Sequence, residues 1–156
     1  MKTVAMLGLA TILIAAAPGC KKEGTPRSPI PSIALTGFGP DSVKLGSSED
    51  TAVLSFSFTD GDADLGNTTA NTDIFLRDSR NGNVQGYSFP EFPDAVRNPD
   101  IGMEGTGTVA LLAAFLLPRD TVHAVTGDTV RYEVWIKDRA GHESNHITTP
   151  DLYLRP

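Results

Sequence analysis

The 156-residue sequence predicts an all-β sandwich of about seven short strands. Apolar and polar residues alternate in two long segments, 52–59 and 130–136, as expected for strands with one buried face. Prolines and glycines divide the rest of residues 32–156 into short segments at the spacing typical of sandwiches. Together these observations favour an all-β domain over a helical one.

Turn signals separate the expected strands. Asn81-Gly82 is a dipeptide that closes tight hairpins, and it lies between the third and fourth strands. Pro90, Pro93 and Pro99 indicate an irregular crossing after the fourth strand, because proline lacks the N–H that a ladder requires. In chain order, the expected strands cover residues 32–35, 52–59, 73–77, 84–89, 108–117, 130–136 and 152–154.

The segment Thr108–Leu117 (TVALLAAFLL) is ambiguous. Its alanine and leucine content favours a helix, but it is short and lacks clean helical amphipathicity. Gly105 and Gly107 precede it and Pro118 follows it, which are typical boundaries of a buried strand. We therefore expect a strand here.

The number and spacing of strands indicate an immunoglobulin-like Greek-key sandwich. Tyr132 lies early in the penultimate strand, four residues after the turn residue Asp128. This position resembles the tyrosine corner of such sandwiches, in which the hydroxyl bonds to upstream backbone. The alternative is that Tyr132 only alternates into the core.

Residues 1–19 are predicted to be a lipoprotein signal peptide. Lys2 precedes an apolar stretch, residues 4–17, that is shorter than the roughly 20 residues of a membrane-spanning helix. Small residues then lead into Cys20, which resembles a bacterial lipobox, although Pro18 departs from the commonest pattern. We expect Cys20 to be acylated and to become the mature N-terminus. The alternative is an ordinary secretory peptide with a chance cysteine.

Residues 20–31 are predicted to be a lipidated, extended tether, because the segment is rich in proline and nearly devoid of apolar residues. An alternative is a strand that already begins at Pro29. The sandwich then covers residues 32–156. A lipid anchor attaches the protein to a membrane of the bacterial cell envelope. By resemblance, lysine after Cys20 favours the outer membrane.

The composition excludes several classes of function. The chain has 13 Lys and Arg against 19 Asp and Glu, a formal net charge of −6, so it lacks the basic surface that nucleic acids require. A single cysteine allows no internal disulfide. No Gly-x-Ser-x-Gly motif occurs, and His142 and His146 lie in an expected loop instead of on the helix of a zinc pair. We expect no enzymatic activity.

Three aspartates at alternate positions, Asp60, Asp62 and Asp64, directly follow a buried strand. Two unit charges 4 Å apart repel by about 4 kcal/mol at a protein-surface dielectric constant of 20. Calcium takes six to eight oxygen ligands in loose geometry and would neutralise such a cluster. The loop is not an EF-hand, because Gly66 comes one position late and Asn71 replaces the bidentate glutamate.

A second polar loop is expected at the same end of the sandwich. In an immunoglobulin-like sandwich, the loop after the second strand and the loop before the last strand emerge together. This arrangement would bring Asp138 and Asn145 of the later loop close to the three aspartates, with Asp73 nearby. The predicted calcium ligands are therefore Asp60, Asp62, Asp64, Asp73, Asp138 and Asn145. The alternative is that the aspartates are solvated turn residues and that Asp138 and Asn145 are local turn caps.

Two motifs carry a family resemblance. They are FTDGDADLG at residues 58–66 and IKDRAGHESN at residues 136–145. With the lipobox, they resemble small lipoproteins of Bacteroidetes-type bacteria that have an FTDGDGDLG-like loop and a late DRAGNxSN-like loop. The sequence departs from this pattern at Ala63, where the family usually has Gly, and at His142, where it usually has Asn. The resemblance implies an immunoglobulin-like or fibronectin-like domain and no particular activity.

The sequence therefore predicts a membrane-tethered envelope lipoprotein that acts as a non-catalytic binding or structural module for an envelope protein or glycan. The alternative is a carbohydrate-binding accessory lipoprotein of a nutrient-uptake system, with Trp135, Tyr87 and Phe92 as stacking surfaces. Trp135 lies out of phase with its core-facing neighbours, so it is expected to point outward. There it either contacts a ligand or is covered by the proline-rich crossing.

The lipid anchor is tested by the substitution Cys20→Ser. Because the thiol is the only acyl acceptor that the lipobox provides, the variant should lose lipid labelling and membrane retention in a bacterial host. The checks are metabolic labelling with a fatty acid and fractionation of the envelope. Labelling or retention that persists in the variant would contradict the lipobox interpretation.

Overall fold

The structure of the chain, a computed structural model, describes residues 27–66 and 72–156. The predicted signal peptide 1–19, Cys20 and residues 20–26 of the predicted tether lie outside the described residues. In the described part, none of the helices has the length and hydropathy needed to cross a lipid bilayer.

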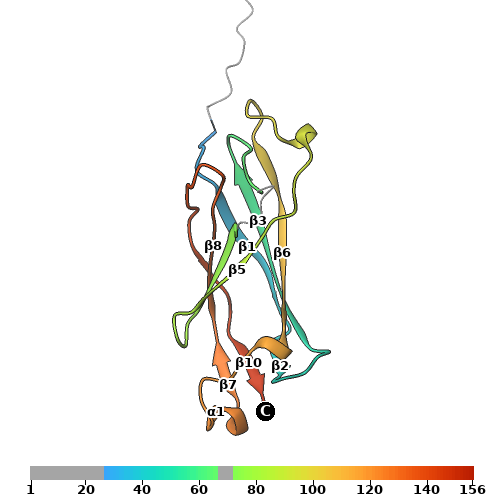
Figure 1. The fold of residues 1–156 in the computed structure, drawn as a ribbon, viewed down its shortest axis with the longest axis vertical. Helices are drawn as coiled ribbons and strands as arrows, with labels where there is room; N and C mark the ends of the chain where they lie inside the picture. The colour runs from blue at the N-terminus through green and yellow to red at the C-terminus, as the bar shows by residue number, and fades with distance from the viewer. Residues whose placement is uncertain (1–26, 67–71) are drawn as a thin grey trace, which may run out of the picture.

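Two sheets form the body of the molecule (Figure 1). The first has the order β1-β3-β6, with β1 at Ser32–Gly39, β3 at Thr51–Asp60 and β6 at Met103–Leu112. The second has the order β5-β4-β8-β9, with β5 at Val84–Tyr87, β4 at Ile74–Asp78, β8 at Tyr132–Ile136 and β9 at Ile147–Thr148.

A smaller third sheet lies at the end of the molecule that holds the C-terminus (Figure 1). Its order is β2-β10-β7, with β2 at Ser42–Lys44, β10 at Leu152–Arg155 and β7 at Asp128–Val130. Three short helices occupy the connections: η1 at Asp94–Val96, η2 at Ala113–Phe115 and α1 at His123–Thr126.

Each of the seven predicted strands overlaps a described strand, and the predicted strand 130–136 is divided at Arg131 into β7 and β8. The short strands β2 and β9 were not predicted from the sequence. Consecutive strands β3 and β4 lie in different sheets, and β6 returns to the first sheet, as in Greek-key sandwiches. The all-β, immunoglobulin-like prediction is confirmed, and the Asn81-Gly82 turn joins β4 to β5 as expected.

Alternation along β3 builds one wall of the core. Every second residue of this strand points inward and is buried, because successive side chains of a strand face opposite sides of the sheet. Burying each large apolar side chain contributes about 1.5–3 kcal/mol. The largest fully buried side chains are Tyr132, Phe56, Leu54, Leu65, Leu76, Leu111, Ile136, Leu152 and Leu154.

Strand β6 differs from its prediction at both ends. It begins at Met103, so Gly105 and Gly107 lie inside the strand instead of bounding it. A Cβ at these two positions would lie 2.8 Å from the ring of Phe58 and 2.4 Å from the ring of Phe56. The two rings of β3 fill the space that side chains of β6 would occupy, so the glycines belong to the strand. At its other end, the predicted strand gives way to η2 after Leu112.

The predicted tyrosine corner is not formed. Tyr132 is fully buried, but its hydroxyl makes no hydrogen bond among the described residues. The alternative interpretation, in which Tyr132 alternates into the core, describes the structure. Burial raises the pKa of its hydroxyl above the ordinary value.

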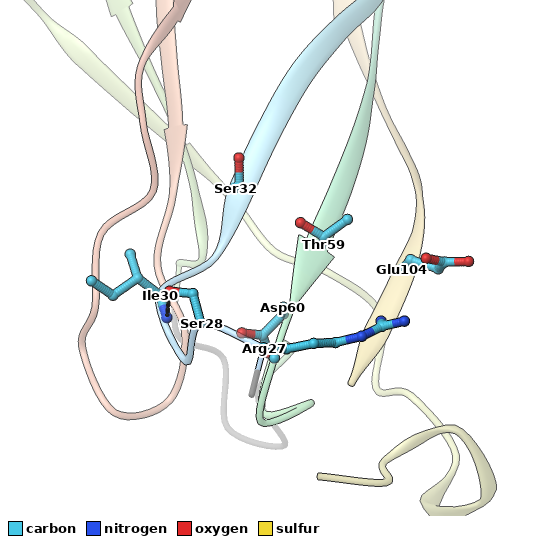
Figure 2. Close-up of a pocket in the computed structure, with 8 residues that line it drawn as sticks. Arg27, Ser28, Ile30, Ser32, Thr59, Asp60 and Glu104 are labelled. Carbon is cyan, nitrogen blue, oxygen red and sulfur yellow. Dashed lines mark hydrogen bonds between the residues drawn. The ribbon is translucent and has the colours of Figure 1, made fainter. Parts of the chain in front are cut away.

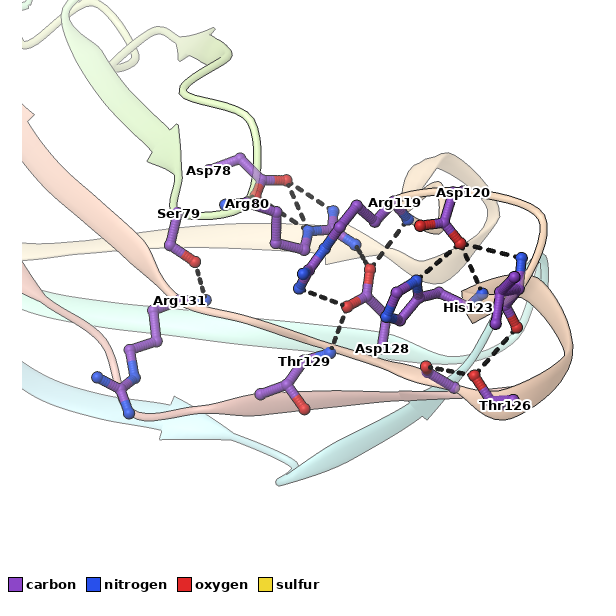
Figure 3. Close-up of polar contacts among 12 residues, drawn as sticks. Asp78, Ser79, Arg80, Arg119, Asp120, His123, Thr126, Asp128, Thr129 and Arg131 are labelled. Atoms are coloured by element: carbon purple, nitrogen blue, oxygen red, sulfur yellow. Dashed lines mark hydrogen bonds and ion pairs between the residues drawn. The ribbon is translucent and has the colours of Figure 1, made fainter.

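A buried ion-pair network holds the C-terminal end together (Figure 3). The side chain of Arg80 is only 5% exposed and lies between two buried carboxylates, 2.6 Å from Asp78 and 2.9 Å from Asp128. Arg80 also donates to the Leu117 carbonyl, and Arg119 donates to Asp128. Burial alone would raise the pKa of Asp128, but hydrogen bonds from Arg80, Arg119 and Thr129 lower it below the ordinary value.

Removing the central cation of this network should destabilise the domain strongly. Arg80→Ala removes the cation between the buried carboxylates of Asp78 and Asp128, which costs about 3–5 kcal/mol of unfolding free energy. The matched control is Arg131→Ala, because Arg131 pairs with Asp151 on the surface and its loss should change stability little. Urea denaturation of both variants checks this prediction, and equal losses of stability would contradict it.

Candidate metal centre

Four aspartates converge at the end of the sandwich opposite to the C-terminus. Asp60 is the last residue of β3, Asp62 and Asp64 follow it, and Asp138 lies two residues after β8. One carboxylate oxygen from each residue lies within 4.8 Å of the other three. We call these four residues the acidic centre. The predicted meeting of the two loops thus occurs for Asp138.

The aspartate loop folds back on the end of β3. The backbone N–H of Asp64 donates to Oδ2 of Asp60 at 2.8 Å, and Leu65 is fully buried in the core. Ala63 adopts a left-handed conformation, with φ of 59°. Glycine adopts this conformation without the steric cost that the Cβ of Ala63 carries.

Three oxygens of the acidic centre accept no hydrogen bond among the described residues. They are the buried Oδ1 atoms of Asp60, Asp62 and Asp64. Asp60 is only 2% exposed, so water does not solvate its charge from an open surface. A buried carboxylate oxygen without a donor is costly unless a proton or a cation neutralises it. The arrangement therefore suits a hard cation with oxygen ligands.

The fourth carboxylate is positioned by its own turn. The side chain of Asp138 is completely buried, and its Oδ1 accepts the backbone N–H of His142 at 2.7 Å. Nδ1 of His142 lies 2.8 Å from Oδ2 of Asp138, and this hydrogen bond raises the pKa of the imidazole. This role of His142 was not predicted from the sequence. Its spacing of four residues from Asp138 within a glycine turn was the available signal.

Direct contacts join the two loops. The backbone N–H of Ala140 donates to Oδ2 of Asp64 at 3.1 Å. From outside, Arg139 and Arg97 both donate to the carbonyl of Gly66, at 2.8 Å and 2.9 Å. These contacts link the backbones of the two loops beside the four carboxylates.

Burial and nearby negative charges raise the pKa of two of these aspartates, Asp60 and Asp64. Burial, followed by the charges of Asp62, Asp64 and Asp138, raises the pKa of Asp60 to about 6, against the opposing hydrogen bond from Asp64. Burial and the Asp138 charge also raise the pKa of Asp64. A bound divalent cation would supply the positive charge that these groups otherwise take from protons.

Two predicted ligands lie outside the acidic centre. Asp73 is buried just before β4, and its backbone bonds with Tyr87 and Lys137. Its carboxylate is not among the four that converge. The side-chain amide of Asn145 bonds to β1: Oδ1 accepts from Ser32 at 3.0 Å and from the Ile33 N–H at 2.9 Å, and Nδ2 donates to the Ile33 carbonyl.

The outward position of Trp135 is covered by its neighbours. Its ring is only 6% exposed, because it stacks between Phe75 and His146, with centroid distances of 5.4 Å and 4.8 Å, and Arg77 lies over it. The covering residues are thus not those of the proline-rich crossing.

The three aromatic residues predicted as sugar-stacking surfaces do not share a face. Tyr87 pairs with the buried Ile74 and packs against the core, on the side of the sheet opposite to Trp135. Phe92 also packs against the core, 6.1 Å from Phe58 between ring centroids.

No protein-family model, curated protein or solved structure matches this chain. The proposal of function therefore depends on the acidic centre and on the N-terminal sequence.

The pKa of Asp60 predicts a dependence of stability on pH in the presence of a chelator. Because this pKa is about 6 in the folded protein against 3.8 ordinarily, protonated Asp60 stabilises the fold at low pH. This contribution is lost as the pH rises through 6. Unfolding free energies of the wild type and of Asp60→Asn, measured from pH 4 to pH 7.5, should diverge, with the wild type losing stability relative to the variant. Parallel curves would contradict the prediction.

Proposed function

We propose that the protein is a lipid-tethered module of the bacterial envelope with a non-catalytic binding or structural role, stabilised by calcium at the acidic centre. The observation that carries the calcium proposal is the convergence of four aspartate carboxylates, three of which have a buried oxygen that accepts no hydrogen bond from the described residues. A bound cation or protons would satisfy such a set of oxygens and neutralise the charge.

The ligand set favours calcium over other common divalent ions. All four ligands are carboxylates, whereas zinc in structural sites takes mostly sulfur and nitrogen. The ligands come from an irregular loop and from a turn, and calcium tolerates such geometry at 2.3–2.6 Å. Magnesium demands near-ideal octahedral geometry at 2.0–2.1 Å and keeps several waters.

A cation at this position would act on stability. It would join the loop that leaves β3 to the turn that leaves β8, two connections of different sheets. Its ligands are otherwise a source of repulsion, so binding removes a destabilising interaction and adds favourable ones. This supports a structural role of the metal within the module.

The membrane part of the proposal is supported by the sequence around Cys20. In the structure, β1 begins at Ser32, at the same end as the acidic centre (Figure 1). The tether would therefore reach the sandwich next to the calcium site. The natural partner is proposed to be an envelope protein or a glycan. No shared aromatic platform favours the carbohydrate alternative, because Trp135 is covered and Tyr87 faces the core.

Calcium should raise the melting temperature of the purified protein. A ligand at 100 times its dissociation constant adds about 2.7 kcal/mol, or roughly 8 °C for a domain of this size. The measurement is thermal unfolding at pH 7.5 with calcium and with a chelator. Asp62→Ala should abolish the shift, because it removes a ligand that has no hydrogen-bond partner to lose at Oδ1.

The matched control is Asp41→Ala, which removes an exposed carboxylate next to β2 at the opposite end. This variant should keep the full calcium shift. An unchanged melting temperature in the wild type, or the same shift in Asp62→Ala, would contradict the calcium proposal.

A further inference from the structure

The segment that connects the tether to β1 lies against the acidic centre. At Gly61, between two of the aspartates, a Cβ would lie 2.1 Å from the carbonyl oxygen of Ser28. At Gly102, a Cβ would lie 3.0 Å from Cδ of Arg27 and 2.8 Å from the carbonyl oxygen of Asp60. Residues 27–28 therefore pack directly against the backbone of Gly61 and Gly102, which have no side chains.

The same segment borders a pocket beside the acidic centre (Figure 2). Arg27, Ser28 and Ile30 line this pocket together with Asp60 and Glu104. In Figure 2 the side chain of Arg27 runs past Asp60 toward Glu104. The first described residues are thus in contact with the loop that holds three of the four carboxylates.

The second loop of the acidic centre also holds this segment. Asn145, in the loop that begins with Asp138, makes three hydrogen bonds to Ser32 and Ile33. The exit segment, residues 27–33, is therefore contacted by the aspartate loop at one point and by the Asp138 loop at another. Its position depends on both loops staying together.

We infer that a cation at the acidic centre clamps the exit segment onto the sandwich, and so fixes the direction in which the chain leaves toward its N-terminal anchor. The inference rests on the proposed function, since it requires the cation. When the cation is bound, all four carboxylates are attracted to it, and the two loops stay together. Gly61 and Asn145 then keep the positions in which they contact residues 27–33. Without it, repulsion between the carboxylates separates the two loops and releases the segment.

The coupling is reciprocal. If calcium holds the exit segment, then displacing that segment must weaken calcium binding by the same factor. Gly61→Ala is the variant that displaces it, because the new Cβ would overlap the Ser28 carbonyl while all four carboxylates remain. Gly37→Ala is its matched control, because the nearest atom to a Cβ there is at 3.8 Å, an ordinary contact.

Trypsin cleavage after Arg27 measures release of the segment in the purified full chain. The rate of this cut, normalised to the cut after Lys22 in the same sample, should fall about tenfold or more when calcium replaces chelator. Gly61→Ala should lose this protection and bind calcium more weakly by calorimetry, whereas Gly37→Ala should keep both.

Amide exchange in the wild type provides a second measurement that needs no variant. Calcium should slow exchange of the Ile33 N–H, which donates to Oδ1 of Asn145. It should not slow exchange of the Leu45 N–H, which donates to the Arg155 carbonyl at the opposite end. A rise in melting temperature with no protection at Arg27 or Ile33 would overturn the clamp and leave the calcium site intact. No rise in melting temperature would overturn the proposed function and the clamp with it.

Discussion

Four negative charges held within one small volume are the constraint on which this structure depends. The Greek-key connections bring the end of β3 and the turn after β8 to the same end of the sandwich, and the core on both strands fixes them there. At about 4 Å, each pair of charges repels by about 4 kcal/mol at a dielectric constant of 20. The fold therefore needs a neutralising partner for Asp60, Asp62, Asp64 and Asp138, and calcium provides it at neutral pH in our proposal.

The two ends of the molecule neutralise buried carboxylates in different ways. At the C-terminal end, Arg80 provides a permanent positive charge between Asp78 and Asp128. At the acidic centre, no described arginine or lysine forms an ion pair with the four aspartates, and Arg139 donates to a carbonyl instead. One end thus carries its own neutralising cation, whereas at the acidic centre our proposal assigns that role to calcium. In this proposal, ion sensitivity lies next to the exit segment, residues 27–33.

Alternation and turn residues predicted the longer strands, because segments such as 52–59 show the strand period of two directly, but they did not reveal the two- and three-residue strands β9 and β2. They failed at β6, because the space above Gly105 and Gly107 is filled by rings from another strand, which no local pattern reveals. Topology also predicted that Asp138 would join the aspartate loop. It could not separate Asp138 from Asn145, because both lie at the same end and only the side-chain contacts assign Asn145 to β1.

The acidic centre combines features that sequence and structure support independently: an alternating aspartate motif, a second acidic turn, and buried oxygens to which none of the described residues donates. The most direct test is a crystal structure of the protein grown with calcium at pH 7.5, with anomalous data collected. The account predicts an anomalous peak with oxygens of Asp60, Asp62, Asp64 and Asp138 at about 2.3–2.6 Å. Carboxylates turned apart into solvent, with no peak between them, would contradict it.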